Sequence, residues 1–379
     1  MKKKLLIATD CFLPRWDGIA RFLLDMIPSL KNDFDITVIA PDFKGDSSFF
    51  EELKDIPIIR LPLSRIHIAD FIVAKADKKI IEKHVKNADV LWVHTISTIG
   101  RRTIDLGKQF NKKTVFLIHS LDHELVAKSL NLPIIIRDAW NVIGKKNILS
   151  YYEKCDVLLT PSRNVDDMLE WNAIKVPKIR VNLGVNLKKF HPPESKSAAK
   201  KAIGFKETDI VIGFCGRIAK EKRIETLFMA FDRIKGDFPQ AKLLIVGKGN
   251  KDIVSLRKEQ KDVFIAGNQD NVVPFLQAMD IFVLPSLVET TSLATLEAMA
   301  CGVAIATTPI GYVKEYIKEK INGVFFPFEN DTVLAVKLKW LIKENYVRES
   351  LGRAARLTVE RNFNLILTKE KIKKVLEEL

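Results

Sequence analysis

Two positively charged side chains stand close together near the middle of the sequence, directly after a short apolar segment. Arg217 follows Gly216, and Lys222 comes five residues after Arg217. When a diphosphate leaves the group to which it is bonded, negative charge accumulates on it, and fixed cations stabilise that charge without requiring a metal ion. These residues form a candidate phosphate site. A solvated basic turn is the alternative, because other charged residues share the segment.

Two carboxylates eight positions apart, Glu289 and Glu297, form a second candidate site. We expect Glu289 in a loop between a strand and a helix, and Glu297 inside that helix, which Gly302 ends. Carboxylates accept hydrogen bonds from sugar hydroxyls, and loop N–H groups can hold phosphate or sugar oxygens. Surface charge is the ordinary explanation for two Glu, but Glu297 stands among apolar residues, where an unpaired charge is costly. The loop residues are Thr290, Thr291, Ser292 and Leu293, of which Thr291 or Ser292 can cap the helix.

A histidine follows a predicted strand in the first half of the chain. His119 comes directly after the apolar run 115–118, which places it at the carboxyl edge of a parallel sheet. There an imidazole can donate a hydrogen bond to a sugar or acceptor hydroxyl. A packing histidine with a satisfied ring is the alternative. His123 and Glu124 complete no zinc spacing, so we expect no metal site.

The first loop of the chain offers another candidate phosphate site. Gly18, preceded by Asp17, opens a predicted helix at 19–30. Glycine permits close backbone approach, and a helix N-terminus presents N–H groups and the positive end of its dipole. The segment lacks the G-x-G-x-x-G pattern of dinucleotide sites, and a plain tight turn remains the alternative.

The elements that must position these residues alternate between strand and helix. Apolar runs at 5–8, 36–40, 90–94, 115–118 and 157–161 predict one parallel sheet, and runs at 210–215, 241–246, 263–266, 281–285 and 304–307 predict a second. We therefore expect an α/β protein with two doubly wound units, whose strand ends border a ligand-binding cleft. We expect an N-terminal domain at 1–189, a Pro- and Ser-containing linker at 190–200 and a C-terminal domain at 201–355. A helical segment at 356–379 is expected to pack against the N-terminal domain.

Composition narrows the class of protein further. A chain of 379 residues with 47% hydrophobic residues is large enough for two cores. The net charge of +14 favours anionic partners such as phosphorylated substrates or acidic membranes, and no recognised nucleic-acid module is present. The basic N-terminus fits a first strand better than a signal peptide, and no apolar run suits a membrane span, so we expect a cytoplasmic protein. The cysteines form no C-x-x-C pair: Cys11, Cys155, Cys215 and Cys301.

Taken together, these motifs resemble the retaining glycosyltransferase family 4, which has the GT-B fold. Gly216 and Arg217 with Lys222 resemble its G-R-x-x-x-x-K motif, and Glu289 with Glu297 resembles its E-x7-E motif. Segments 182–192, 246–249 and 280–286 match in order and spacing, so the resemblance covers nearly the whole chain. The ordered combination is far more specific than any single motif.

The resemblance implies a nucleotide-sugar donor carrying UDP or GDP, with no cofactor and no metal. Arg217 and Lys222 would bind the donor phosphates, Glu289 would lie beside the donor sugar, and His119 would lie near the transferred sugar. Glu297 would hold the ribose hydroxyls. The donor-binding residues that it implies are Gly18, Gly216, Gly247, Thr290, Thr291, Ser292, Leu293 and Glu297. The first loop has one glycine where the family often has two, and residues 290–292 replace its Gly-Phe-Gly, so backbone N–H groups are kept while side chains crowd the sugar pocket.

The acceptor is expected to be a saccharide or a lipid-linked molecule bound by the first domain. Residues 69–86 and 134–148 each fit a helix with basic and apolar residues, which could rest on an acidic membrane surface; an ordinary surface helix is the alternative. A nucleotide-sugar epimerase of the same architecture and a non-catalytic sugar-nucleotide-binding protein remain alternative functions.

Overall fold

A computed structural model describes residues 2–15, 17–44, 51–68, 71–119, 134–250, 253, 260–289 and 291–379. The chain forms two compact units, which we call unit 1 (Met1–Leu183 with Thr368–Leu379) and unit 2 (Gly184–Leu367). The first boundary therefore lies a few residues before the predicted one at 189. The last segment joins unit 1 from Thr368, later than the predicted 356.

Unit 1 is built on a parallel sheet with the strand order β3-β2-β1-β6-β7-β8-β9. Its inner strands are buried on both faces, as in all four residues of β6, and this burial explains their continuous apolar sequences. In the registers, Leu5 pairs with Ile36 on one side and Val90 on the other. The strands are β1 (Lys3–Ala8), β2 (Phe34–Pro41), β3 (Ile58–Leu61), β6 (Val90–Val93), β7 (Lys113–Leu117), β8 (Val157–Thr160) and β9 (Lys178–Arg180).

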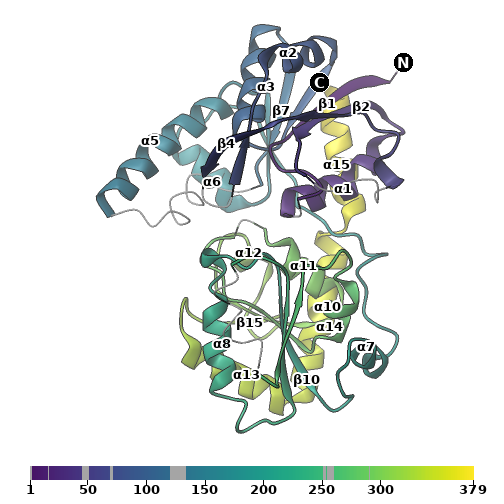
Figure 1. Cartoon of the computed structure of the whole chain (residues 1–379), viewed down its shortest axis with the longest axis vertical. Helices are drawn as coiled ribbons and strands as arrows, with labels where there is room; N and C mark the ends of the chain where they lie inside the picture. The colour runs from purple at the N-terminus through teal and green to yellow at the C-terminus, as the bar shows by residue number, and fades with distance from the viewer. Residues whose placement is uncertain are drawn as a thin grey trace. The chain divides into compact units, whose positions relative to one another are not determined.

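Helices cover this sheet, and their ends follow capping rules. Asp17 starts α1 by accepting hydrogen bonds from the N–H groups of Ile19 and Ala20, and Ser162 caps α6 through Val165. Figure 1 shows α2 and α3 beside each other, with α1 and α15 elsewhere along the sheet. The helices are α1 (Gly18–Leu30), α2 (Lys78–Asn87), α3 (Thr98–Gln109), α5 (Ile134–Tyr152), α6 (Arg163–Trp171) and α15 (Leu365–Glu378), with a short 3-10 turn at Glu51–Leu53.

The helix predicted at 69–86 is wrong in its first half. An antiparallel pair, β4 (Leu63–Ile68) and β5 (Phe71–Ala74), occupies this region, and α2 begins only at Lys78. The apolar spacing satisfied a helix, but β5 consists largely of aromatic and β-branched residues that favour strands. Asp77 then starts α2 by accepting from two N–H groups. The helix predicted at 134–148 is confirmed as part of α5.

Unit 2 repeats the architecture with the strand order β12-β11-β10-β13-β14-β15. The described strands pair in parallel, for example Ile212 with Leu243 on one side and Ile281 on the other. Three predicted strands match the structure residue for residue. The strands are β10 (Ile210–Cys215), β11 (Ala241–Val246), β12 (Val263–Gly267), β13 (Ile281–Leu284), β14 (Ala304–Thr307) and β15 (Val324–Phe325).

The helices of unit 2 lie on both faces of its sheet, with α8 and α13 on one face and α10, α11 and α14 on the other (Figure 1). The predicted linker 190–200 is structured: Phe190 is fully buried, and Ser195 caps a short helix, α7. A Ser before a run of good helix formers indicates the start of a helix, but the prolines just before it favoured a linker. The helices are α7 (Lys196–Ala202), α8 (Ile224–Asp232), α10 (Val273–Ala278), α11 (Leu293–Ala300), α12 (Val313–Tyr316), α13 (Asp331–Lys343) and α14 (Asn345–Asn362), with a 3-10 turn at Lys220–Lys222.

The end of the chain is divided between the units. α14 packs against β14 and α11 inside unit 2. In α15, Thr368 donates to the carbonyl of Asn182 at 2.7 Å, and Lys373 pairs with Asp33 at the end of α1. The C-terminal helix is thereby fixed to unit 1 by specific polar contacts.

Candidate functional site

The strand order of unit 2 identifies the edge where a ligand is expected. β10 lies between β11 and β13, so the chain connections diverge on either side of it. In open α/β sheets, ligands bind outside the carboxyl ends of the strands at such a switch in strand order. The loop of Arg217 follows β10 and the loop of Glu289 follows β13. The sheet therefore brings both predicted motifs to the same edge.

The charged side chains of these two loops form ion pairs. The Lys222 ammonium lies 2.5 Å from Oε1 of Glu289, which also accepts a hydrogen bond from the Ser286 hydroxyl at 3.0 Å. Arg217 donates to Glu221, whose side chain is only 4% exposed. Each predicted phosphate-binding cation is thus held by a carboxylate, and Lys222 is joined to the first Glu of the E-x7-E motif.

Backbone contacts fix the two loops to one another. The N–H of Leu287 donates to the carbonyl of Glu221 at 2.8 Å, and the hydroxyl of Thr308 donates to the carbonyl of Ser286 at 2.6 Å. The buried Tyr316 hydroxyl donates to the carbonyl of Thr291 at 2.8 Å, and burial raises its pKa well above the usual range. The charged groups therefore stand on a fixed backbone.

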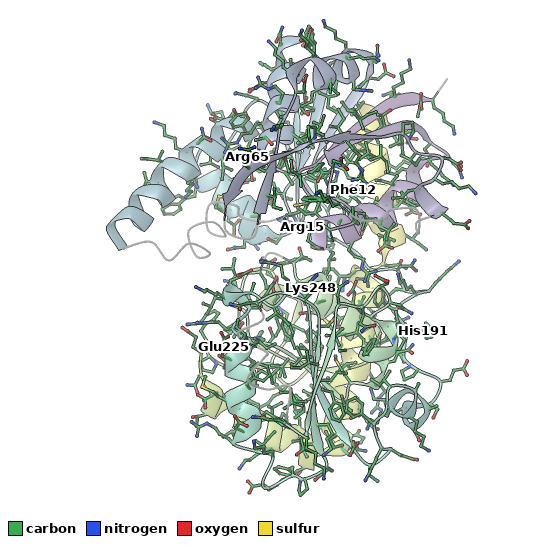
Figure 2. All side chains as sticks on the ribbon, in the orientation of Figure 1. Phe12, Arg15, Arg65, His191, Glu225 and Lys248 are labelled. Atoms are coloured by element: carbon green, nitrogen blue, oxygen red, sulfur yellow. The ribbon has the colours of Figure 1, made fainter. Side chains whose placement is uncertain are left out.

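Two glycines allow the loops after β10 and β11 to approach closely. Gly216 and Gly247 have φ of 151° and 135°, and a Cβ on Gly247 would lie 1.9 Å from the carbonyl oxygen of Gly216. Only glycine meets both requirements. Lys248, labelled in Figure 2, is exposed in the same loop, and its carbonyl accepts from the N–H of Ile218 at 3.0 Å.

The start of α11 differs from the capped helix that was predicted. Ser292 occupies the N-cap position with φ of 57°, but its hydroxyl pairs with that of Thr295 at 2.9 Å rather than with a backbone N–H. The hydroxyl thus contacts a side chain of the first turn and does not cap the helix. The Oγ1 of Thr291 is buried with no partner among the described residues. Leu293 is the first helical residue, and Thr290 lies outside the described residues.

Glu297 lies inside α11 with 6% of its surface exposed. Burial raises the pKa of Cys301, one turn later, to about 12, and the nearby Glu297 carboxylate contributes to that shift. The other cysteines, at positions 11, 155 and 215, are buried as well. Within the described parts of the chain, no group of three or more His, Cys, Asp or Glu has the arrangement of a metal site.

In unit 1, His119 lies at the carboxyl edge of the sheet, as predicted, and contacts a second histidine. Its Nε2 lies 2.9 Å from Nδ1 of His94, which follows the neighbouring strand β6. Burial lowers the pKa of His119 to about 3 and that of His94 well below its ordinary value. Both rings are therefore neutral at pH 7.

Gly18 opens α1, and a Cβ there would meet nothing within 4 Å, so packing does not require glycine at this position. The loop before it carries Phe12 and Arg15, both labelled in Figure 2. Asp10, in the same loop, accepts from the hydroxyls of Thr95 and Thr98 and from the N–H of Ile99. These bonds tie the end of β1 to the start of α3.

Family models match both halves of the chain. The model described as Glycosyltransferase Family 4 matches residues 16–187, and the model described as Glycosyl transferases group 1 matches residues 195–358. The chain belongs to the family 4 glycosyltransferases. It is a hexosyltransferase with the GT-B fold of two Rossmann-like domains.

Named relatives cover nearly the whole of this glycosyltransferase. It is 24% identical over 338 residues to the alpha-monoglucosyldiacylglycerol synthase of Acholeplasma laidlawii, covering 84% of each chain. It is 24% identical over 393 residues to a GDP-mannose-dependent mannosyltransferase of Corynebacterium glutamicum that acts on a monoacylated phosphatidylinositol monomannoside, covering 99% of this chain and 98% of the relative. The structure of Anabaena HepE in complex with UDP and glucose matches over 100% of both chains, with 14% identity and a TM-score of 0.79.

The predicted site residues of the glycosyltransferase fall into two groups. Gly18 and His119 belong to unit 1, whereas the phosphate and sugar motifs belong to unit 2. Sequence reasoning did not select His94, Glu221 or Ser286. Only His94 carried a usable signal, because it follows a strand end just as His119 does, and the two strands are neighbours.

Proposed function

We propose that this glycosyltransferase moves a hexose from a UDP- or GDP-sugar to a saccharide or lipid-linked acceptor, with retention of anomeric configuration and without a metal ion. The observation that carries the proposal is the pair of cations at the carboxyl edge of unit 2, where Arg217 and Lys222 are each held by a carboxylate. They stand beside the switch in strand order, where ligands of such sheets bind.

The donor diphosphate would take up the charge of these cations. A guanidinium carries five N–H donors, so its contact with Glu221 does not exhaust it, and it fits phosphate oxygens well. The Lys222 ammonium is shared with Glu289, and a diphosphate offers more negative charge than that single carboxylate. The start of α11, which has no side-chain cap, supplies N–H groups suited to phosphate or sugar oxygens.

In the reaction, the bond between the anomeric carbon and the diphosphate oxygen breaks, and a bond to the acceptor hydroxyl oxygen forms. The hydroxyl proton passes to the departing nucleoside diphosphate. Arg217 and Lys222 would stabilise the charge that grows on the leaving group, so no metal would be required. Glu289 would orient the donor sugar and Glu297 the ribose, and His119 would donate to a hydroxyl near the transferred sugar.

A lipid-linked acceptor is supported by the two named relatives, whose names give lipid products or acceptors. On α5, Val142 and Ile143 are each 70% exposed, close to the exposed Lys146, which suits the surface of an acidic membrane. We place the enzyme in the cytoplasm at that surface. Among the described helices, none is long and apolar enough to cross a bilayer. In a flotation assay, the enzyme should rise with anionic vesicles, and added salt should weaken this binding. Binding that does not depend on salt or on lipid charge would contradict this placement.

The test is transfer of label from UDP-glucose, UDP-N-acetylglucosamine or GDP-mannose to diacylglycerol, glycolipid and simple saccharide acceptors. We expect product only when donor and acceptor are both present. The NMR spectrum of the product should show the anomeric configuration of the donor, and a chelator should not prevent transfer. Donor consumption without any acceptor would favour an epimerase. An inverted product would refute retention.

A further inference from the structure

His94 and His119 form a hydrogen-bonded pair at the carboxyl edge of the sheet of unit 1. Nδ1 of His94 and Nε2 of His119 are 2.9 Å apart, and the ring centroids are 5.2 Å apart. His94 is 2% exposed, whereas His119 is only partly buried. The outer ring of the pair is therefore the one that a substrate can reach.

Apolar rings hold both imidazoles in place. Phe22 of α1 meets His119 edge-on with ring centroids 5.2 Å apart, and the ring centroids of Trp92 in β6 and His94 are 4.3 Å apart. Because these surroundings disfavour a charged ring, both imidazoles are neutral, and each carries one N–H proton.

A hydrogen bond between two neutral imidazoles has two possible arrangements. If Nδ1 of His94 carries the proton, it donates to Nε2 of His119, and His119 then carries its own proton on Nδ1 as a donor. If Nε2 of His119 donates instead, His94 must carry its proton on Nε2, and Nδ1 of His119 becomes an acceptor. The arrangement thus decides whether His119 offers a substrate hydroxyl a donor or an acceptor.

The surroundings of His94 favour the first arrangement. Its Nε2 is buried and has no hydrogen-bond partner among the described residues. A buried N–H without a partner is rarer and more costly than a buried acceptor without one. The Nε1–H of the adjacent Trp92 ring is also unpartnered within the described ranges, and a proton on Nε2 of His94 would add a second buried N–H without a partner.

We propose that His94 is a positioning residue that fixes His119 in the tautomer protonated on Nδ1, so that His119 presents a hydrogen-bond donor. What this donor meets rests on the proposed function, in which it binds a hydroxyl at the transferred sugar. The tautomer itself is a property of the protein without substrate.

The first test is a long-range proton–nitrogen NMR spectrum of the ¹⁵N-histidine-labelled protein. The chain has six His, so single substitutions assign the signals. We expect His119 to be protonated on Nδ1 in the wild type and to change tautomer or to populate both in His94→Leu. In His94→Asn, the amide N–H stands near the former Nδ1 position and should restore the wild-type tautomer.

Turnover supplies the second readout. His94→Leu should lower kcat about tenfold, as expected for one lost hydrogen bond, with little change in the donor KM. His94→Asn should recover most of this loss, whereas His84→Asn, on α2 of the same unit, should leave turnover unchanged.

Protonation of His119 on Nε2 in the wild type would overturn the proposal, as would an unchanged tautomer in His94→Leu. If His94→Leu does not fold, the wild-type spectrum and His94→Asn decide the question. The NMR readout needs no donor, so an inactive protein with the expected tautomer would count against the proposed function and not against the role of His94.

Discussion

The carboxyl edges of the two sheets carry opposite kinds of polar chemistry. In unit 2, charged groups meet: Lys222 pairs with Glu289, and Arg217 pairs with Glu221. In unit 1, the groups that meet are neutral imidazoles enclosed by aromatic rings, with burial keeping His119 uncharged. Similar topology therefore supports ion pairs at one edge and a neutral imidazole pair at the other.

This difference matches the two partners of a glycosyl transfer. A nucleoside diphosphate is an anion that needs fixed cations, whereas a sugar is a neutral polyol that needs directed hydrogen bonds and an apolar surface. In the function that we propose, the ion pairs of unit 2 serve the leaving group, and the imidazole pair of unit 1 serves a hydroxyl near the transferred sugar. It can be tested by changing each edge separately.

The largest expected effect is on stability and compares one glycine from each unit. Gly247→Ala places a Cβ against the carbonyl of Gly216 at a positive φ, and should destabilise the protein by about 3–5 kcal/mol through strain and overpacking. Gly18→Ala meets open space and should change the free energy of unfolding by less than about 0.5 kcal/mol. Denaturant titrations measure both. Equal stabilities would show that the loop contact after β10 does not constrain the edge of unit 2.

The next largest effect is on transfer. Arg217→Ala and Lys222→Ala should each lower kcat about 10²- to 10³-fold, because each removes a charge that we propose stabilises the leaving group. Lys220→Ala removes an exposed charge from the same turn and should leave kcat within about twofold. Initial rates with radiolabelled donor, together with thermal melts that show intact folding, measure this. Full activity of both variants would refute the phosphate assignment.

The neutral imidazole pair of unit 1 predicts that the stability of the protein depends on pH. His94 stays uncharged in the folded protein but takes up a proton in the unfolded chain below its ordinary pKa of about 6.5. The unfolded chain therefore binds more protons at this residue than the folded protein does. Because of His94, the free energy of unfolding should fall by about 2 kcal/mol as the pH is lowered from 7 to 5. His94→Asn should lose that part of the pH dependence in urea titrations. If the free energy of unfolding depended on pH equally in the variant and the wild type, His94 would be taking up a proton in the folded protein as it does in the unfolded chain.

A smaller effect tests how Arg217 is held. Glu221→Gln keeps the shape and a hydrogen-bond acceptor but removes the charge that pairs with Arg217. We expect the donor kcat/KM to fall about threefold to tenfold, as for the loss of one charge-assisted hydrogen bond. Glu207→Gln, in an exposed pair with Lys201, is the matched control and should have no effect. An unchanged kcat/KM in both would show that the Glu221 charge does not position the guanidinium.

The parallel sheets and the sequence positions of the charged motifs were predictable. Buried parallel strands are continuous apolar runs, so β10, β11 and β14 were predicted to the residue, and loops after such strands share one edge. The pairing of Lys222 with Glu289 was not predictable, because it depends on the packing of two loops 67 positions apart.

The errors arose where two local signals competed. The segment of β5 has helix-like apolar spacing, and its preference for a strand becomes decisive only through pairing with β4. Thr291 or Ser292 was expected to cap α11, but Ser292 has a left-handed backbone and its hydroxyl pairs with Thr295, and the hydroxyl of Thr291 has no partner among the described residues. His94 was overlooked although it follows a strand end as His119 does, because its link to His119 becomes visible only once the two strands are known to be neighbours.

Calorimetric titration of the protein with UDP and with GDP tests the central claim most directly. We predict that one of the two binds the wild type and Lys220→Ala equally well, and that Arg217→Ala and Lys222→Ala each weaken its binding at least tenfold. Binding of the same strength in all four proteins would contradict the assignment of the unit 2 cations to the donor diphosphate.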